Sequence, residues 1–285
     1  MNTLEIPELQ RKIEYPSCWE ECSPSQVLFI FRQTIDLLAG RMTMDSYLLR
    51  IFFHLTQIRI KHPDLTDRHL TAEQRIVKYD NMARACRTVD FMFPGGLETP
   101  VFEYASVANQ LPHIKIGRDI CHAPADALLD VTFGEYRMAC DLYRQYLSGS
   151  VSDAAARLVS VLYRPVGPLG GRAFGRLPFD AAECDHRSHR ATKLPEEVLF
   201  YVATWFGACD RYIKTEDLVI EGRRINLSCL FTKATGSDDS DEDVSNDGNL
   251  GLLGIQLALA ESGTFGDMDG VDRANIYTVL LKLYQ

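Results

Sequence analysis

The feature that most constrains this chain is a series of segments whose apolar side chains recur at helical spacing between helix start and stop signals. The clearest of them spans residues 23–40, SPSQVLFIFRQTIDLLAG. Ser23 and Gln26 fit a capping box, Pro24 suits the first helical position, and Gly40 ends the run. The segment therefore predicts an amphipathic helix that needs a packing partner.

The residues that follow repeat this pattern. We expect a second helix over about 43–60 and a third over about 71–91, joined by short connections. Three successive helices with short connections predict an antiparallel helical module over residues 1–94.

Helical signals return in the second half of the chain. Thr132 and Glu135 fit a capping box before two helices, which a short SGS break separates and Pro165 ends. Each large apolar side chain buried between them contributes about 1.5–3 kcal/mol, which predicts an αα-hairpin. A helix over about 195–213 follows, and LGLLGIQLALAES and VDRANIYTVLLKLYQ predict two more at the C-terminus. Together they predict a module over residues 131–285.

Between the helical segments the composition changes. Glycine and proline breaks over residues 95–130 indicate an extended connector. β-Prone runs predict small hairpins near 101–116 and 217–231. Residues 236–249 form an acidic linker that is poor in apolar side chains. The expected fold is mainly α: two helical modules of antiparallel helices, with small β-hairpins in the connectors.

The formal net charge of −9 has a local origin. Six acidic residues lie in TGSDDSDEDVSNDGN, which contains no lysine or arginine, and the rest of the chain carries a net charge of −3. A protein that binds the phosphate backbone needs a basic patch, so we expect no nucleic-acid partner.

Eight cysteines are scattered through the sequence, several of them beside large apolar residues, and we expect mostly free thiols. No apolar run approaches the ~20 residues of a membrane span. The start, MNTLEIPELQRKIEYP, lacks the apolar core of a signal peptide. These features predict a cytoplasmic protein without a membrane partner.

One stretch, FDAAECDHRSHRATKLPEE, brings together Cys184, His186 and His189. Zinc prefers cysteine and histidine, but the spacing is atypical, and a catalytic zinc needs three protein ligands and a water. Cys18 and Cys22 are candidates for further sulfur ligands to this zinc from a distant part of the sequence. Their stretch is also explained as the entry into the helix that Ser23 caps. We interpret the stretch around Cys184 as a solvated loop before a helix and keep the zinc site as the alternative.

Two other segments carry weaker motifs. GPLGGRAFGR lacks the preceding strand, the following helix and the Lys-Ser/Thr pair of a phosphate-binding loop, so we expect a flexible loop in which Arg172 and Arg176 serve as contacts. DMDGVD, with Asp267, Asp269 and Asp272, lacks the glutamate that an EF-hand needs at its twelfth position. We expect a turn there, with Asp269 or a neighbour capping the final helix.

The sequence contains neither a G-x-S-x-G elbow nor a paired-histidine helix motif. His54 lies within an apolar helical segment, where a core or rim role is expected. We therefore expect no cofactor, no bound metal and no enzymatic activity.

Four long segments carry a resemblance to known proteins. They are YPSCWEECSPSQVLFIF, LLDVTFGEYRMACDLYRQYL with AARLVSVLYRP, RLPFDAAECDHRSHRATKLPEEVLFYVATWFGACDRYI, and LALAESGTFGDMDGVDRANIYTVLLKLY. In this order they resemble proteins encoded in the tail regions of phages and prophages of Bacteroidetes-type bacteria, near the tail-tube and tape-measure genes. The likeness covers most of the chain but consists of packing and turn signatures, so it assigns no functional residues.

The resemblance implies a tail structural protein or a chaperone-like tail-assembly factor that acts through protein–protein contacts. Its partners would be other phage tail proteins, the tail tube or the tape measure, and homo-oligomer formation stays open. The implied location is the bacterial host cytoplasm or the virion tail. The alternative hypothesis is a zinc-binding hydrolase or a metal-stabilised regulatory protein that uses Cys184, His186 and His189.

Overall fold

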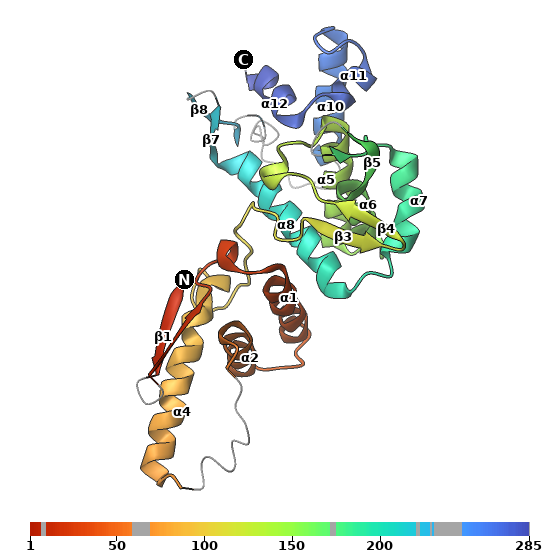
Figure 1. Ribbon diagram of the computed structural model, residues 1–285. Helices are drawn as coiled ribbons and strands as arrows, with labels where there is room; N and C mark the ends of the chain where they lie inside the picture. The colour runs from red at the N-terminus through yellow and green to blue at the C-terminus, as the bar shows by residue number, and fades with distance from the viewer. Residues whose placement is uncertain are drawn as a thin grey trace. The chain divides into compact units, whose positions relative to one another are not determined.

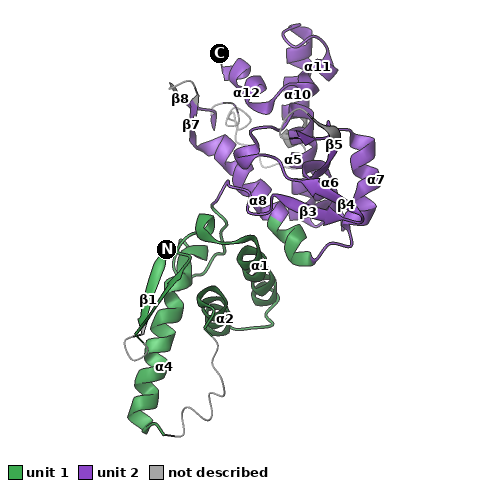
Figure 2. Cartoon of the chain, in the orientation of Figure 1, with its two compact units in different colours: residues 1–105, 196–201 green, residues 106–195, 202–285 purple. Residues whose placement is uncertain are grey.

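The computed structural model describes residues 1–6, 10–58, 69–171, 175–220, 223–228, 230 and 247–284. The described part is rich in α-helix and contains three small antiparallel sheets (Figure 1). The chain divides into two compact units, shown in Figure 2. Unit 1 comprises Met1–Ala105 and Glu196–Tyr201, and unit 2 comprises Ser106–Pro195 and Val202–Gln285.

Unit 1 begins with a hairpin of two strands that the sequence analysis did not anticipate. The elements of unit 1 are β1 (Asn2–Ile6), β2 (Arg11–Tyr15), the 3₁₀ turn η2 (Trp19–Glu21), α1 (Pro24–Leu38), α2 (Met44–Thr56), α4 (Ala72–Cys86) and the 3₁₀ segment η3 (Arg87–Met92). The three helices expected in this part of the chain are therefore confirmed.

The helix boundaries follow local signals. Ser23 and Gln26 form the expected capping box at the start of α1. Helix α2 ends at Thr56, earlier than predicted, because Gln57 adopts a left-handed conformation with φ of 55° that stops the helix. The third predicted helix is α4 followed by η3, with a break in helical geometry at Val89.

The core of unit 1 is an aromatic cluster around Trp19. The Trp19 ring lies 4.6 Å from Tyr104 and 5.9 Å from Phe31, measured between ring centroids, and its indole nitrogen donates a hydrogen bond to the Glu103 carbonyl oxygen (3.2 Å). Phe31 also contacts Tyr201 in the first turns of α8 (Glu196–Thr215). The two Trp19 pairs are tilted and the Phe31–Tyr201 pair is edge-to-face, and ring contacts at these distances stabilise the core beyond the burial of each ring. The cluster brings residues from four distant parts of the sequence into one core.

Unit 2 combines helices with a four-stranded sheet of order β3-β4-β5-β6. Its elements are β3 (His113–Ile116), β4 (Asp119–His122), the 3₁₀ turn η4 (Asp126–Leu128), α5 (Phe133–Ser148), α6 (Ala154–Leu162), β5 (Arg164–Gly171), β6 (Gly175–Arg176), α7 (Ala181–Ala191), the rest of α8, β7 (Asp217–Ile220), β8 (Arg223–Asn226), α10 (Asp247–Glu261), α11 (Met268–Arg273) and α12 (Ile276–Tyr284).

The hairpin prediction for 217–231 is confirmed by β7 and β8, whereas the one for 101–116 is misplaced. The hairpin in this part of the chain spans residues 113–122. Gly117, with φ of 64°, makes its tight turn. The 101–112 segment has the right composition for a strand but includes Pro112, which cannot donate a ladder hydrogen bond.

The predicted αα-hairpin is confirmed as α5 and α6. Helix α6 packs against both α5 and α7, and all of its residues except Arg157 are buried. In α8 the Trp205 ring is buried, and its indole nitrogen donates to the Val107 carbonyl oxygen (3.1 Å). These contacts place the centre of unit 2 around α6 and α8.

The C-terminal helices dock on the start of α5. A β-bridge joins Thr132 to Asn275, and the Phe133 amide donates to the Ala274 carbonyl oxygen (2.9 Å). Asp272 lies over Gly134, so close that a Cβ atom at Gly134 would stand 2.9 Å from the Asp272 Cγ atom. A carboxylate near the first turn of a helix also interacts favourably with the helix dipole.

The expectation of a turn at DMDGVD needs correction. Asp267 caps the short helix α11, and the chain leaves the helical conformation at Ala274 before α12 begins. The acidic linker predicted at 236–249 lies mostly outside the described residues, and its last three residues open α10. Within the described residues, no helix has both the length and the apolar character to cross a membrane.

We predict that Gly134→Ala destabilises the protein. Alanine normally favours a helix over glycine, but here its methyl group would collide with Asp272, which α11 holds in place. The expected loss is about 1–3 kcal/mol in the free energy of unfolding, measured by urea denaturation followed by circular dichroism.

Gly254→Ala in α10 is the matched control, because a Cβ atom there meets nothing within 4 Å. This variant should be more stable than the parent by about 0.5–1 kcal/mol. A similar gain for Gly134→Ala would disprove the close contact with Asp272.

Candidate functional site

The three candidate zinc ligands lie on a helix and do not converge. The expected solvated loop is wrong, because Asp180 accepts hydrogen bonds from the amides of Ala182 and Glu183 and thereby starts α7. Cys184 is buried, whereas His186 and His189 are exposed. Among the described residues, no group of three or more His, Cys, Asp or Glu side chains is arranged to hold a metal ion.

The glycine-rich segment also differs from its prediction. The expected flexible loop is wrong where the structure describes it, because Arg164–Gly171 forms β5 and Gly175–Arg176 forms β6. Arg172 lies outside the described residues. Arg176 was expected as a surface contact, but its side chain is only 1% exposed.

Arg176 is buried because it is surrounded by acceptors. Its Nε and Nη2 atoms donate to the Asp130 carboxylate at 3.1 and 2.8 Å, and its Nη1 atom donates to Glu135 Oε1 at 2.9 Å. The Leu162 carbonyl oxygen accepts a further bond at 2.8 Å. Both carboxylates are also buried, with side chains at most 2% exposed.

Glu135 connects this group to a second arginine. Arg164 Nη1 lies 2.7 Å from Glu135 Oε1, and Arg164 Nη2 donates to Oε2 at 3.1 Å. The Arg164 Nε atom donates to the Leu177 carbonyl oxygen at 2.8 Å. Arg164, Arg176, Asp130 and Glu135 therefore form one buried network of two positive and two negative charges, which we call the charge network.

The charge network corrects part of the capping prediction. Thr132 caps α5 as expected by accepting from the Glu135 amide, but the Glu135 side chain contacts the arginines. Burial alone would lower the pKa of the Arg176 guanidinium, yet the charges of Glu135 and Asp130 raise that pKa above its usual value. The two carboxylates thus stabilise the charged form of Arg176.

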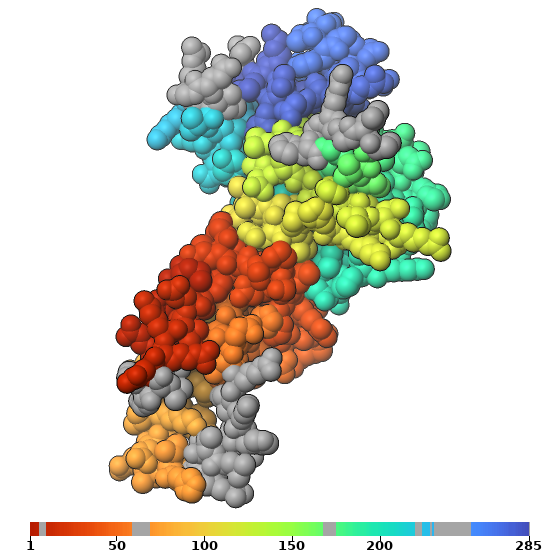
Figure 3. Space-filling view, in the orientation of Figure 1, coloured from red at the N-terminus to blue at the C-terminus, as the bar shows by residue number. Residues whose placement is uncertain are grey.

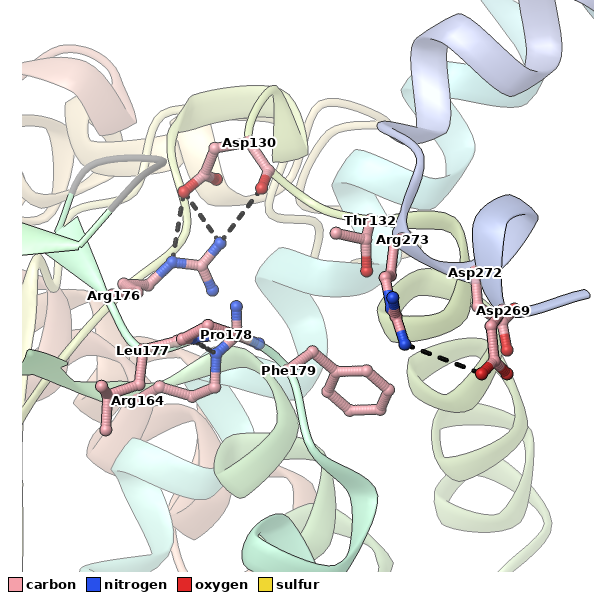
Figure 4. A pocket seen from close by; sticks show the side chains of 10 residues that line it. All are labelled: Asp130, Thr132, Arg164, Arg176, Leu177, Pro178, Phe179, Asp269, Asp272 and Arg273. Carbon is pink, nitrogen blue, oxygen red and sulfur yellow. Dashed lines mark hydrogen bonds and ion pairs between the residues drawn. The ribbon is translucent and has the colours of Figure 1, made fainter. Parts of the chain in front are cut away.

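A pocket of about 570 Å³ opens beside the charge network. Figure 4 shows Arg164 and Arg176 on one side of it, the Phe179 ring near the middle, and Asp269 and Asp272 of α11 on the other side. Three acidic and three basic side chains line the pocket, so their formal charges cancel. Arg164 and Arg176 already bind carboxylates and carbonyl groups, which leaves them little capacity for a ligand.

The thiols are poorly suited to nucleophilic chemistry. Burial, followed by the charge of Cys18, raises the pKa of Cys22 to about 12, and burial raises the pKa of Cys86 and Cys121 to about 11. The pKa values of Cys140 and Cys209 are raised further, also mainly by burial. Because the thiolate is the reactive form, such cysteines are inert at neutral pH. The seven cysteines in the described part of the chain are free thiols, as expected.

His54 has a packing role. Its ring stacks on Phe29 with 3.7 Å between centroids and 7° between planes. Burial lowers the pKa of this imidazole, so the neutral ring is favoured. The rim position expected from the sequence agrees with this contact.

Helix α4 exposes the large apolar side chains of Ile76, Val77 and Tyr79. Every residue from Ala72 to Val77 is exposed, and Figure 3 shows α4, in orange, at the surface. One face combines Ile76, which is 68% exposed, with Tyr79, which is 48% exposed. Residues three and four positions apart share a helix face. We call the row Ile76, Tyr79, Met82, Ala83 and Cys86 the α4 stripe.

The α4 stripe leads into a groove of about 360 Å³ between α2 and α4. Leu48 and Leu49 of α2 face Met82 and Ala83 of α4 across it. Polar side chains of Asp45, Ser46 and Arg87 also line the groove. The α4 stripe extends beyond it to the exposed Ile76. Exposed apolar rows of this kind are typical of surfaces that bind a partner helix.

Comparison with models of known families, with curated proteins and with solved structures gave no match for this chain. The charge network could not be found from sequence spacing, because its members lie up to 46 residues apart. The α4 stripe could have been noticed from the apolar spacing within 71–91, which the sequence analysis used only to predict a helix.

We predict that Arg176→Met strongly destabilises unit 2. The change leaves Asp130 and part of Glu135 as buried charges without their partner, which costs about 3–5 kcal/mol. Urea denaturation measures the loss. Arg190→Met is the control: it removes the ion pair between Arg190 and Asp119, whose side chains are 43% and 42% exposed, and should cost about 0–1 kcal/mol. Equal effects of the two changes would contradict a structural role for the charge network.

We also predict selective thiol labelling. At pH 8, Ellman's reagent should modify the half-exposed Cys18 in the native protein and reach Cys22 only after unfolding. Cys18→Ser should therefore remove one fast-reacting equivalent, whereas Cys22→Ser should leave the fast phase unchanged. A fast phase lost with Cys22→Ser would show that this thiol is accessible and reactive.

Proposed function

We propose that this protein is a non-enzymatic phage tail structural or tail-assembly protein that acts by binding another tail protein. The observation that carries the proposal is the α4 stripe, whose apolar side chains are exposed at Ile76 and Tyr79. Soluble proteins usually bury apolar rows of this length, and a contiguous exposed row marks a contact surface.

The chemistry of unit 2 supports binding over catalysis. The charged groups of the charge network bind one another beside the pocket that Arg164 and Arg176 line. The buried thiols have raised pKa values. A catalytic site instead presents titratable groups with spare hydrogen-bonding capacity to its substrate. The resemblance to proteins of phage tail regions supplies the class of partner: the tail-tube or tape-measure protein.

The partner surface that fits the groove between α2 and α4 is an amphipathic helix. The groove is lined by the apolar residues Leu48, Leu49, Met82 and Ala83, and by Asp45 and Arg87 among others. A helix with an apolar row at three- and four-residue spacing fits such a groove.

We predict that Ile76→Glu weakens this binding. A buried glutamate would be desolvated in the complex, so the affinity for the tail partner should fall about tenfold or more. The measurement is a pull-down from co-expression with the products of the neighbouring tail-tube and tape-measure genes, followed by titration of the purified pair.

Val77→Glu is the matched control. Val77 is also exposed, at 58%, but it lies about 100° around the helix from Ile76 and farther from the rest of the α4 stripe. It should leave the affinity unchanged. Equal losses in both variants would place the contact elsewhere, and failure to bind any tail protein would overturn the proposed function.

A further inference from the structure

The β3–β4 hairpin brings the His113 and His122 rings side by side in an edge-on arrangement, with 73° between their planes. The two residues are direct partners in the antiparallel register, and their ring centroids are 4.4 Å apart. They are nine positions apart in the sequence, and neither belongs to the motif around Cys184 that first suggested a metal. This pair is therefore a feature that the fold creates.

The hydrogen-bond pattern explains why the two rings are so close. The Ala123 amide donates to the Pro112 carbonyl oxygen at 3.0 Å, so Pro112 and Ala123 form a hydrogen-bonded pair. Antiparallel pairs alternate, which makes the adjacent pair His113 and His122 a non-hydrogen-bonded one. Side chains in such pairs approach most closely, with Cβ atoms about 4.5–5.5 Å apart.

Both imidazoles lie on the face of the hairpin away from the core. Ile114 and Cys121, the next pair along, are buried, whereas His113 is exposed and His122 is half-buried. Burial, and to a smaller extent the charge of His113, lowers the pKa of His122. Imidazole nitrogens are common metal ligands, and the rings of this pair lie 4.4 Å apart between centroids.

A cavity of about 190 Å³ lies beside the pair. Its wall includes Asp126 and Asn109, and the Asp126 Oδ1 atom accepts a hydrogen bond from the Asn109 amide at 2.8 Å. The cavity has room for an ion with water ligands, and a carboxylate in its wall contributes negative charge. Pro112 and Pro124 also line it and restrict the backbone on both sides.

We infer that His113 and His122 form a two-imidazole site for a divalent first-row transition-metal ion, with water completing the coordination. Nitrogen ligands approach such an ion to about 2.0–2.1 Å, and rotation of the two rings about their side-chain bonds can close the pair around it. Imidazole ligands favour Cu²⁺, Ni²⁺ and Zn²⁺ over Mg²⁺ and Ca²⁺, which prefer oxygen. Such an ion would cross-link β3 and β4. This inference is independent of the proposed tail-assembly function.

The test is calorimetric titration of the full chain with NiCl₂ and ZnCl₂ at pH 7.5. We expect one equivalent of each ion to bind to the parent protein. When a metal-binding side chain loses the hydrogen bond that orients it, metal affinity falls about 10–100-fold. Removal of the metal-binding side chain itself should lower the affinity at least as much. His113→Ala and His122→Phe should both show this loss, and the phenyl ring preserves the packing between the strands.

His186→Ala and His189→Ala are the controls, because both histidines are exposed on α7 and three positions apart. They should retain the parent affinity. Circular dichroism of each variant without metal checks that the fold is intact. Unchanged binding in His122→Phe, binding lost with the α7 variants, or no binding by the parent protein would each overturn the inference.

Discussion

The structure of unit 2 depends on the charge network beside its pocket of about 570 Å³. Asp130 precedes α5, Glu135 lies in its first turn, Arg164 starts β5 and Arg176 ends β6. The network thus fixes the N-terminal end of α5 against the sheet. Two buried arginines would be costly on their own, but each carboxylate offsets that cost and each guanidinium also binds backbone carbonyl groups. The two arginines stand at the outer ends of β5 and β6, which contain the glycine-rich segment.

The same end of α5 receives the C-terminal helices. Thr132 pairs with Asn275, and the Phe133 amide donates to the Ala274 carbonyl oxygen. Asp272 fits over Gly134 only because glycine has no side chain. The first turn of α5 is consequently the place where the sheet, the charge network and the C-terminal helices meet. The residues of this turn have structural roles. The two surfaces proposed for binding lie elsewhere, on unit 1 and on the outer face of the β3–β4 hairpin.

Much of the helical content was predictable from the sequence, because it rests on short-range signals. The capping box of Ser23 and Gln26 and the apolar spacing of α5, α6 and α8 identify helices without knowledge of the rest of the chain. The loop prediction for the stretch around Cys184 was wrong for a related reason. Its polar residues are typical of a loop, although Asp180 caps a helix there. Only the burial of one face against α6 distinguishes the two outcomes.

The sequence by itself determined the positions of most helices, the hairpin at 217–226 and the free state of the described cysteines, since each follows from local spacing or composition. Tertiary structure alone decided that Arg176 is buried, that Glu135 binds arginines as well as starting a helix, and that His113 faces His122. The physical reason is distance along the chain: charges and rings interact through space, and their partners are set by strand register and helix packing, which no local pattern encodes.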